Sequence, residues 1–483
     1  MTGMAGILLS LAALIYFAYR GVSVLILAPL MALVAVLFSQ APLLASYTQV
    51  FMPALAGFVA LYFPLFLLGA VFGKLMEASG SAAAIGRGLA ERLGARHAIL
   101  AVVLACALLT YGGVSLFVVA FAVYPIAAAL FREAGVPQRL IPASIALGAF
   151  TFTMTALPGT PAIQNAIPMP FFNTTPFAAP GLGIVGGALM LALGAAWLLW
   201  RSRSARRAGE GYGGEASAAA IADEDLREHA QGEGYDIAEL DAAAASAAGP
   251  SLALAVAAPI ILVVALNYVF SSWLIPAMDT GYLAAPEYGA TSVDKVRGVW
   301  AIIAALALSI AMLLAVHAKR IQKPRRALDD GASASVLPVL NTASQVGFGA
   351  VIASLPAFAA IRDAMLGIAP GNPLVSLAVA VNVLAGITGS ASGGISIALQ
   401  TLGAHYLEMA QAASIAPELL HRVTAIATGG LDALPHNGAV ITLLAICKLT
   451  HRQSYFDIFM VAVLSPIAAL IAVVALGTLF GAF

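Results

Sequence analysis

Long runs of apolar residues are the feature that most constrains the fold of this 483-residue chain. A transmembrane helix needs about 20 apolar residues, with a range of roughly 17–25. Runs of this kind recur along the whole chain, at 4–19, 22–38, 53–73, 97–131, 180–200, 251–274, 296–316 and 454–480. Transmembrane β-strands alternate apolar and polar residues and rarely produce such runs. The pattern therefore predicts an all-α, polytopic membrane protein.

Composition agrees with this fold class. Apolar residues make up 61% of the chain and charged residues 10%, against about 45–50% and about 25% in soluble domains. These values exclude a soluble enzyme, a nucleic-acid binder and a disordered protein. The two cysteines, Cys106 and Cys447, lie in apolar surroundings and are interpreted as small core residues rather than a disulfide or a metal pair.

One long segment, residues 201–249, is hydrophilic. Between Arg201 and Asp241 it holds five basic and ten acidic residues, and it is rich in Ala and Gly. Such a segment buries too little apolar surface to fold alone, so we predict a flexible cytoplasmic linker. A regulatory or partner-binding loop is the alternative. The linker would divide the chain into a first transmembrane repeat, 1–200, and a second, 250–483.

Lysine and arginine residues predict the orientation in the membrane, because they mark the cytoplasmic side in short loops. They cluster at Lys74–Arg96, Arg201–Arg207 and Lys319–Arg326. These clusters share one side only if residues 97–131 leave and re-enter that side as a helical hairpin. Both termini are then predicted to lie outside.

Three short motifs recur in the same order, which indicates an internal repeat. Gly69-Ala70-Val71 recurs as Gly349-Ala350-Val351, Gly112-Gly113-Val114-Ser115 as Gly393-Gly394-Ile395-Ser396, and Ala156-Leu157-Pro158 as Ala433-Leu434-Pro435. The first span enters from outside, whereas its counterpart at 251–274 enters from inside. The sequence therefore predicts two inverted repeats, each with a hairpin and a broken helix, as in many secondary transporters. The alternative is that Gly-rich membrane helices resemble each other by chance.

Four segments rich in Gly, Ser or Pro interrupt the apolar helices: the first break (110–115), the second (156–165), the third (388–396) and the fourth (429–438). Unwound backbone in a membrane must be covered by protein or line a wet cavity. Broken helices also present free N–H groups to anions. The predicted substrate-binding residues are Thr110, Gly112, Gly113, Ser115, Thr160, Gln164, Asn165, Ser390, Ser392, Gly393, Gly394, Ser396 and Asn437. Alternatively, single hydroxyls bond their own i−4 carbonyls.

Asp432 and His436 are the two ionisable residues of the fourth break. Ionisable residues inside membranes are costly and indicate function. Either side chain could carry a coupling proton, so we predict that this pair binds the coupling cation. The structural alternative is that Asp432 caps a half-helix and His436 donates to a carbonyl.

The chain resembles the gluconate permease (GntP) family of the ion transporter superfamily along nearly its whole length. The resemblance rests on FLLGAVFGKLMEASG (66–80), TYGGVSLFVVAFAVYP (110–125), ALPGTPAIQNAIP (156–168) and GGLDALPHNGAVITLLAICKLTHRQSYFDI (429–458). These stretches look most like the branch of D-3-hydroxybutyrate or short organic-acid permeases. Gluconate carriers have a Gly-Leu-Pro-Val-Phe-Phe-Glu-like run where this chain has Tyr111–Ser115. The resemblance implies a proton- or sodium-coupled symporter, a homodimer and an elevator-like moving domain.

The sequence thus predicts a cation-coupled symporter for a small organic anion, with a short hydroxy-monocarboxylate such as 3-hydroxybutyrate as substrate. The alternatives are a gluconate or other sugar-acid symporter, a citrate:H+ symporter, and an organic-anion channel or facilitator. No nucleophile–base pair or metal-binding motif is visible, so we expect no enzyme activity and no cofactor besides the coupling H+ or Na+. The expected location is the bacterial cytoplasmic (inner) membrane, with the lipid bilayer and no nucleic acid as partner.

Overall fold

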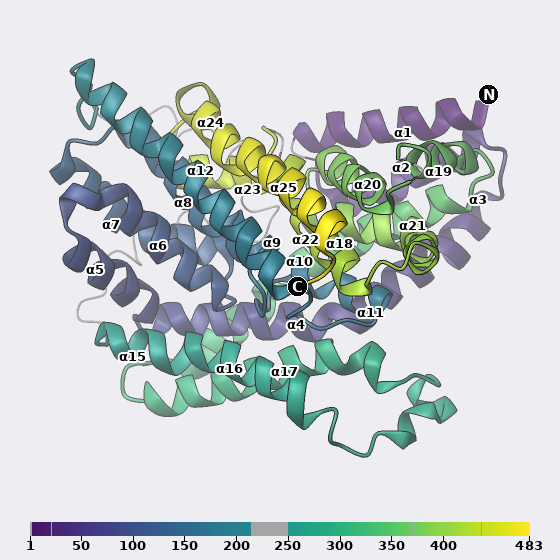
Figure 1. Cartoon of the computed structure of the whole chain (residues 1–483), viewed down its shortest axis with the longest axis horizontal. Helices are drawn as coiled ribbons and strands as arrows, with labels where there is room; N and C mark the ends of the chain where they lie inside the picture. Colours follow the sequence, from purple (N-terminus) through teal and green to yellow (C-terminus); the bar gives the residue numbers. More distant parts are fainter. Residues whose placement is uncertain (1, 21, 214–249, 370, 436) are drawn as a thin grey trace.

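The computed structural model describes residues 2–20, 22–213, 250–369, 371–435 and 437–483, and all regular secondary structure in these ranges is helical (Figure 1). Six of the described helical segments are long and apolar enough to cross a membrane: Leu43–Ala78, Pro180–Arg207, Leu252–Leu274, Val293–Val316, Pro324–Ser354 and His451–Phe480. A seventh candidate is the pair Ser81–Leu93 and Ala95–Tyr111, bent by 106°. The fold is therefore that of a polytopic helical membrane protein, as predicted.

The first half begins with two apolar helices and ends with a long one. Its helices are α1 (Thr2–Tyr19), α2 (Val24–Phe38), α3 (Leu43–Ala45), the π-helical η1 (Ser46–Phe51), α4 (Met52–Ala78), α5 (Ser81–Leu93), η2 (Ala95–His97), α6 (Ala98–Tyr111), α7 (Leu116–Ala134), η3 (Gln138–Leu140), α8 (Ile141–Ala149), α9 (Phe152–Thr155), α10 (Ile163–Ala166), α11 (Pro168–Phe172) and α12 (Pro180–Arg207). Helices α6 and α7 pack against each other and form the hairpin predicted for 97–131.

The second half shows the same order of elements. Its helices are α15 (Leu252–Val256), η6 (Ala257–Ile261), α16 (Leu262–Val269), η7 (Phe270–Leu274), η8 (Gly281–Ala284), η9 (Pro286–Tyr288), α17 (Val293–Val316), α18 (Pro324–Ser354), α19 (Phe358–Leu366), α20 (Pro373–Thr388), α21 (Ala391–Ala412), α22 (Pro417–Leu431), α23 (Gly438–Ile446), α24 (His451–Phe459), η10 (Met460–Leu464) and α25 (Ser465–Phe480). Each half thus contains, in the same order, a long helix (α4 or α18), a hairpin (α6–α7 or α20–α21) and a broken helix (α9–α10 or α22–α23). The inverted orientation of the two halves remains a prediction.

The long helices α4 and α18 pack along each other, and α18 also contacts α2 and α21. In Figure 1 the hairpin α6–α7 lies on the left and the hairpin α20–α21 on the right, while α15, α16 and α17 lie below α4. The two hairpins therefore occupy opposite ends of the view.

Helix α12 continues to Arg207, so residues 201–207 belong to a long helix rather than to the predicted linker. Arg201 Nε lies 2.8 Å from Oδ1 of Asp457 in α24, a residue only 1% exposed. Arg139 Nη1 lies 3.0 Å from the other carboxylate oxygen of Asp457 and Arg139 Nε lies 2.7 Å from Glu210. These contacts hold the charged end of α12 against the bundle. The rest of the predicted linker, 214–249, lies outside the described residues.

Cysteine labelling tests the predicted orientation. Ser292 precedes α17 and Ser204 lies near the end of α12, and both residues are exposed. A cysteine replacing Ser292 should react with an impermeant thiol reagent added to intact cells, whereas one replacing Ser204 should stay unlabelled. The two native cysteines are buried, so the unmodified chain is a silent control. Labelling of the Ser204 position from outside would contradict the predicted topology.

Candidate functional site

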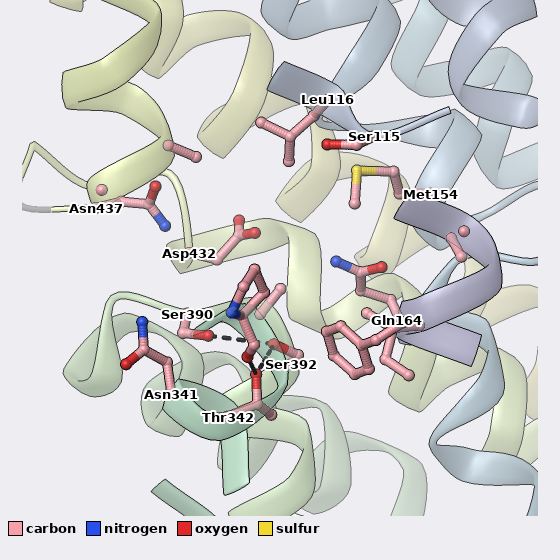
Figure 2. Close-up of a pocket in the computed structure, with 18 of the residues that line it drawn as sticks. Ser115, Leu116, Met154, Gln164, Asn341, Thr342, Ser390, Ser392, Asp432 and Asn437 are labelled. Carbon is pink, nitrogen blue, oxygen red and sulfur yellow. Dashed lines mark hydrogen bonds between the residues drawn. The ribbon is translucent and has the colours of Figure 1, made fainter. Parts of the chain in front are cut away.

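All four sequence breaks meet at one cavity of about 340 Å³ (Figure 2). From the breaks themselves, the lining includes Thr110, Gly113, Val114, Ser115, Pro161, Ala162, Ile163, Gln164, Thr388, Gly389, Ser390, Ala391, Ser392, Asp432, Ala433, Asn437 and Gly438. Segments far apart in the sequence are therefore brought to one site, and the site lies among helices that are apolar enough to span a membrane.

The first and third breaks are the tips of the two hairpins. Helix α6 ends at Tyr111 and α7 begins at Leu116. Between them Gly113 has a φ of +92°, and a Cβ there would lie 2.8 Å from Pro161 of the second break. The tip thus needs glycine both for its backbone angle and for its close approach to the neighbouring break.

In the second hairpin, α20 ends at Thr388 and α21 begins at Ala391. Gly389 forms the turn with a φ of +61°. Ser390 caps α21, because its Oγ accepts the backbone N–H of Gly393 at 3.1 Å. Ser390, Ser392 and Thr342 of α18 are joined by hydroxyl–hydroxyl contacts of 3.4 and 3.1 Å, drawn in Figure 2.

The second and fourth breaks separate α9 from α10 and α22 from α23. Each is tied to the hairpin tip of its own half. In the first half the Tyr111 hydroxyl donates to the carbonyl of Pro158 at 2.7 Å. In the second half Asn437 Nδ2 donates to the carbonyl of Gly389, also at 2.7 Å. Tip and break therefore form one polar unit in each half.

The structure brings eight of the predicted site residues to the cavity: Thr110, Gly113, Ser115, Gln164, Ser390, Ser392, Asp432 and Asn437. Six others lie outside its lining: Gly112, Thr160, Asn165, Gly393, Gly394 and Ser396. His436 lies outside the described residues. The cavity thus combines predicted residues from all four breaks. The other described predicted residues lie in the same breaks but do not line the cavity.

The six predicted residues lie outside the cavity lining for different physical reasons. The Ser396 hydroxyl donates to its own i−4 carbonyl at Ser392, 2.6 Å away, which is the alternative role expected of hydroxyls in helices. A Cβ at Gly394 would lie 2.3 Å from the backbone of Ala385 in α20, so Gly394 allows the two arms of the hairpin to approach. A Cβ at Gly112 would lie 2.7 Å from the Ile260 side chain.

Asn165 and Thr160 belong to the second break but lie outside the cavity lining, and Asn165 lies next to Arg422 of α22. The Asn165 Nδ2 donates to the carbonyls of Thr160 and Pro176 at 3.0 Å each. Its Oδ1 lies 3.3 Å from Arg422 Nη1 and 3.1 Å from His421 Nε2. The amide of Asn165 therefore holds the unwound backbone of the second break.

Among the described lining residues, charge comes from a single group. Asp432 is the one ionisable residue among the described lining residues, and its carboxylate projects into the cavity (Figure 2). Asp432 follows the last residue of α22, whereas the N-cap of α23 is Asn437, whose Oδ1 accepts the N–H of Val440. Among the described residues, no group of three or more His, Cys, Asp or Glu side chains could hold a metal ion.

Sequence reasoning missed one wall of the cavity. Helix α18 contributes Ser335, Asn341, Thr342 and Gln345. The sequence signal was present, because α18 is the least apolar of the six candidate spans and its polar residues at 335, 342 and 345 recur at helical spacing. A pattern of Gly- and Pro-rich breaks does not identify an unbroken helix such as α18.

The comparisons with known proteins bear on what this cavity serves. The chain matches no protein-family model. It is 45% identical over 481 residues to the "Uncharacterized transporter YxjC" of Bacillus subtilis (strain 168), and the match covers 98% of each chain. A match of this identity thus extends over nearly the whole chain. The chain therefore belongs to the same family of membrane transporters as YxjC.

Proposed function

We propose that the protein is a secondary active transporter that couples the uptake of a short hydroxy-monocarboxylate, such as 3-hydroxybutyrate, to a proton or sodium gradient. The observation that carries the proposal is the cavity at the four breaks, which offers neutral hydroxyl and amide groups together with one carboxylate, Asp432. The resemblance of the break motifs to the short organic-acid branch of the gluconate permeases supports the same substrate class.

An organic anion fits the electrostatics of the cavity walls. The N-terminal ends of α21 and α23 both reach the cavity, through Ser390, Ala391, Asn437 and Gly438. Helix N-termini carry partial positive charge and free N–H groups, which favour carboxylates. Such ends bind the carboxylate of the substrate in transporters with broken helices. An anion can therefore bind here without a Lys or Arg side chain.

The size and chemistry of the cavity favour a short acid over larger ones. Its volume of about 340 Å³ is at the lower end of ligand sites, which range over roughly 300–1,000 Å³. A di- or tricarboxylate would favour a bidentate Arg clamp, and no arginine belongs to the described lining. Apolar side chains such as Val114, Leu116 and Ile163 also line the cavity, so the hydroxyls of a sugar acid would lack partners there.

Asp432 gives a physical reason for cation coupling. Two negative charges in a small cavity repel each other more strongly than in water, because their surroundings are less polar. Binding of H+ or Na+ at Asp432 removes this repulsion when the anionic substrate binds. Anion and cation would then bind together, which is the requirement for symport and distinguishes this function from a channel or facilitator.

Uptake into proteoliposomes tests the proposed substrate and coupling. Labelled 3-hydroxybutyrate should accumulate above its external concentration when a proton or sodium gradient is imposed, because the substrate moves with the cation. Excess unlabelled 3-hydroxybutyrate or lactate should compete, and gluconate and citrate should compete only at higher concentration. Gluconate or citrate competing at lower concentration than the short monocarboxylates would contradict the substrate assignment. Equilibration without accumulation would indicate a facilitator.

A further inference from the structure

The two halves of the chain line the cavity with different chemistry. The large apolar side chains come mainly from the first half, among them Leu65 and Phe66 of α4, Leu116 and Met154. Most of the polar side chains come from the second half, and α18 supplies Asn341, Thr342 and Gln345. The cavity therefore has one apolar wall and one polar wall.

The contrast is sharpest between α4 and α18, the helices that the predicted repeat makes equivalent. The offset of 280 that relates Gly69-Ala70-Val71 to Gly349-Ala350-Val351 also relates Leu65 to Gln345. Both of these residues line the cavity. At equivalent positions, one half thus presents an isobutyl group and the other an amide of similar size.

Two amides of α18 are buried without a partner for their oxygen atoms. Gln345 is 4% exposed and Asn341 is 8% exposed. In the part of the chain that the structure describes, neither Gln345 Oε1 nor Asn341 Oδ1 has a hydrogen-bond partner. A buried polar atom left without a partner is destabilising. Both amides also line the cavity, so a ligand toward which either amide oxygen turns would supply the missing donor.

Gly393 of the third break leaves the space that the Gln345 amide occupies. A Cβ at Gly393 would lie only 1.3 Å from Gln345 Oε1, so the amide occupies the space that any other residue at 393 would fill. This contact explains why Gly393, a predicted site residue outside the cavity lining, still bears on the site. Gly393 follows Ser390 and Ser392, whose hydroxyl groups form the contacts with Thr342 described above.

We infer that Gln345, supported by Asn341, binds the hydroxyl group of the substrate and so determines the preference for hydroxy acids over unsubstituted acids. The inference rests on the proposed function. A hydroxyl donates to one amide oxygen and can accept from an amide N–H, which matches the groups that α18 presents. The methyl-ended carbon chain then lies against the apolar wall of Leu65 and Leu116.

The test compares uptake of 3-hydroxybutyrate and butyrate, which differ by one hydroxyl group. Gln345→Leu places in α18 the residue that α4 carries at the equivalent position, with little change in volume. Loss of a hydrogen bond to the substrate should lower the preference for 3-hydroxybutyrate over butyrate, measured as the ratio of Vmax/KM values, by about tenfold. Uptake of butyrate should persist. Gly393→Ala should lower the preference in the same direction, since its methyl group displaces the Gln345 amide.

Gln411→Leu is the matched control, because Gln411 is exposed near the end of α21, and it should keep the wild-type preference. An unchanged preference in Gln345→Leu, with an active wild type, would overturn the assignment of Gln345 alone. If Gln345→Leu transports neither acid, Gly393→Ala takes its place in the test. A lowered preference for 3-hydroxybutyrate in Gly393→Ala would then support the assignment, and an unchanged preference would overturn it. Failure of the wild type to take up either acid would overturn the proposed substrate, and the role of Gln345 with it.

Discussion

Replacement of Asp432 with asparagine is expected to reduce gradient-driven uptake to the level of protein-free vesicles while substrate exchange continues. Asparagine preserves the shape of the side chain, but at neutral pH it neither takes up or releases a proton nor carries a charge. Asp432 is the one ionisable residue of the described cavity lining, so no other described group there can replace it. Exchange needs no net movement of the coupling cation and should therefore survive.

The experiment measures two quantities in the same proteoliposomes. One is accumulation of labelled substrate under an imposed gradient, and the other is counterflow into vesicles preloaded with unlabelled substrate. Asp363→Asn is the matched control, because Asp363 is exposed in α19, 2.9 Å from Arg362, and it should accumulate substrate normally. Full accumulation by Asp432→Asn would show that the Asp432 carboxylate is structural and that the coupling cation binds elsewhere.

The four breaks were predictable from the sequence because local chemistry decides them. Glycine at a left-handed backbone angle, as at Gly113 and Gly389, and proline in the second and fourth breaks interrupt helices wherever they are placed. The first hairpin was predictable too, because the positive-inside rule leaves few ways to place 97–131. The breaks follow from short stretches of sequence, and the hairpin follows from a count of membrane crossings.

The polar wall of α18 was not predictable in this way. Whether Gln345 faces the cavity or lipid depends on the rotation of α18 about its axis, which is set by packing against α4 and α2. The end of α12 was missed for a similar reason. By its neighbours in the sequence Arg201 belongs to a hydrophilic segment, but the fold brings Asp457, far away in the sequence, to 2.8 Å from it.

The role of Arg422 also depends on distant partners, and it leads to the largest effect expected on stability. Arg422 is fully buried on α22. Its guanidinium donates to the carbonyl of Ala178 at 2.7 and 3.0 Å and to the carbonyl of Ala156 at 3.0 Å. Ala156 follows the last residue of α9, and Ala178 lies two residues before the start of α12. Arg422 thus joins the second half of the chain to the second break.

Arg422→Met is therefore expected to destabilise the protein strongly. Methionine keeps much of the volume of the side chain but donates no hydrogen bond, and it leaves two buried carbonyls without their partner. At roughly 1–3 kcal/mol for each orphaned group, the loss is about 2–6 kcal/mol, offset in part because a cation no longer has to be buried. A loss of this size is a large share of the net stability of a folded domain, about 5–15 kcal/mol.

The measurement is the thermal unfolding midpoint in detergent, together with the fraction of protein that elutes as a single species. Arg452→Met is the matched control, since Arg452 is exposed in the first turn of α24, and it should unfold at the wild-type temperature. Asn165→Ala should show a smaller decrease in midpoint, because the Thr160 carbonyl loses the Asn165 amide whereas Pro176 keeps donors from Gly159 and Arg422. A wild-type midpoint for Arg422→Met would show that water or a neighbouring donor replaces the guanidinium, and that the second break keeps its shape without contacts from α22.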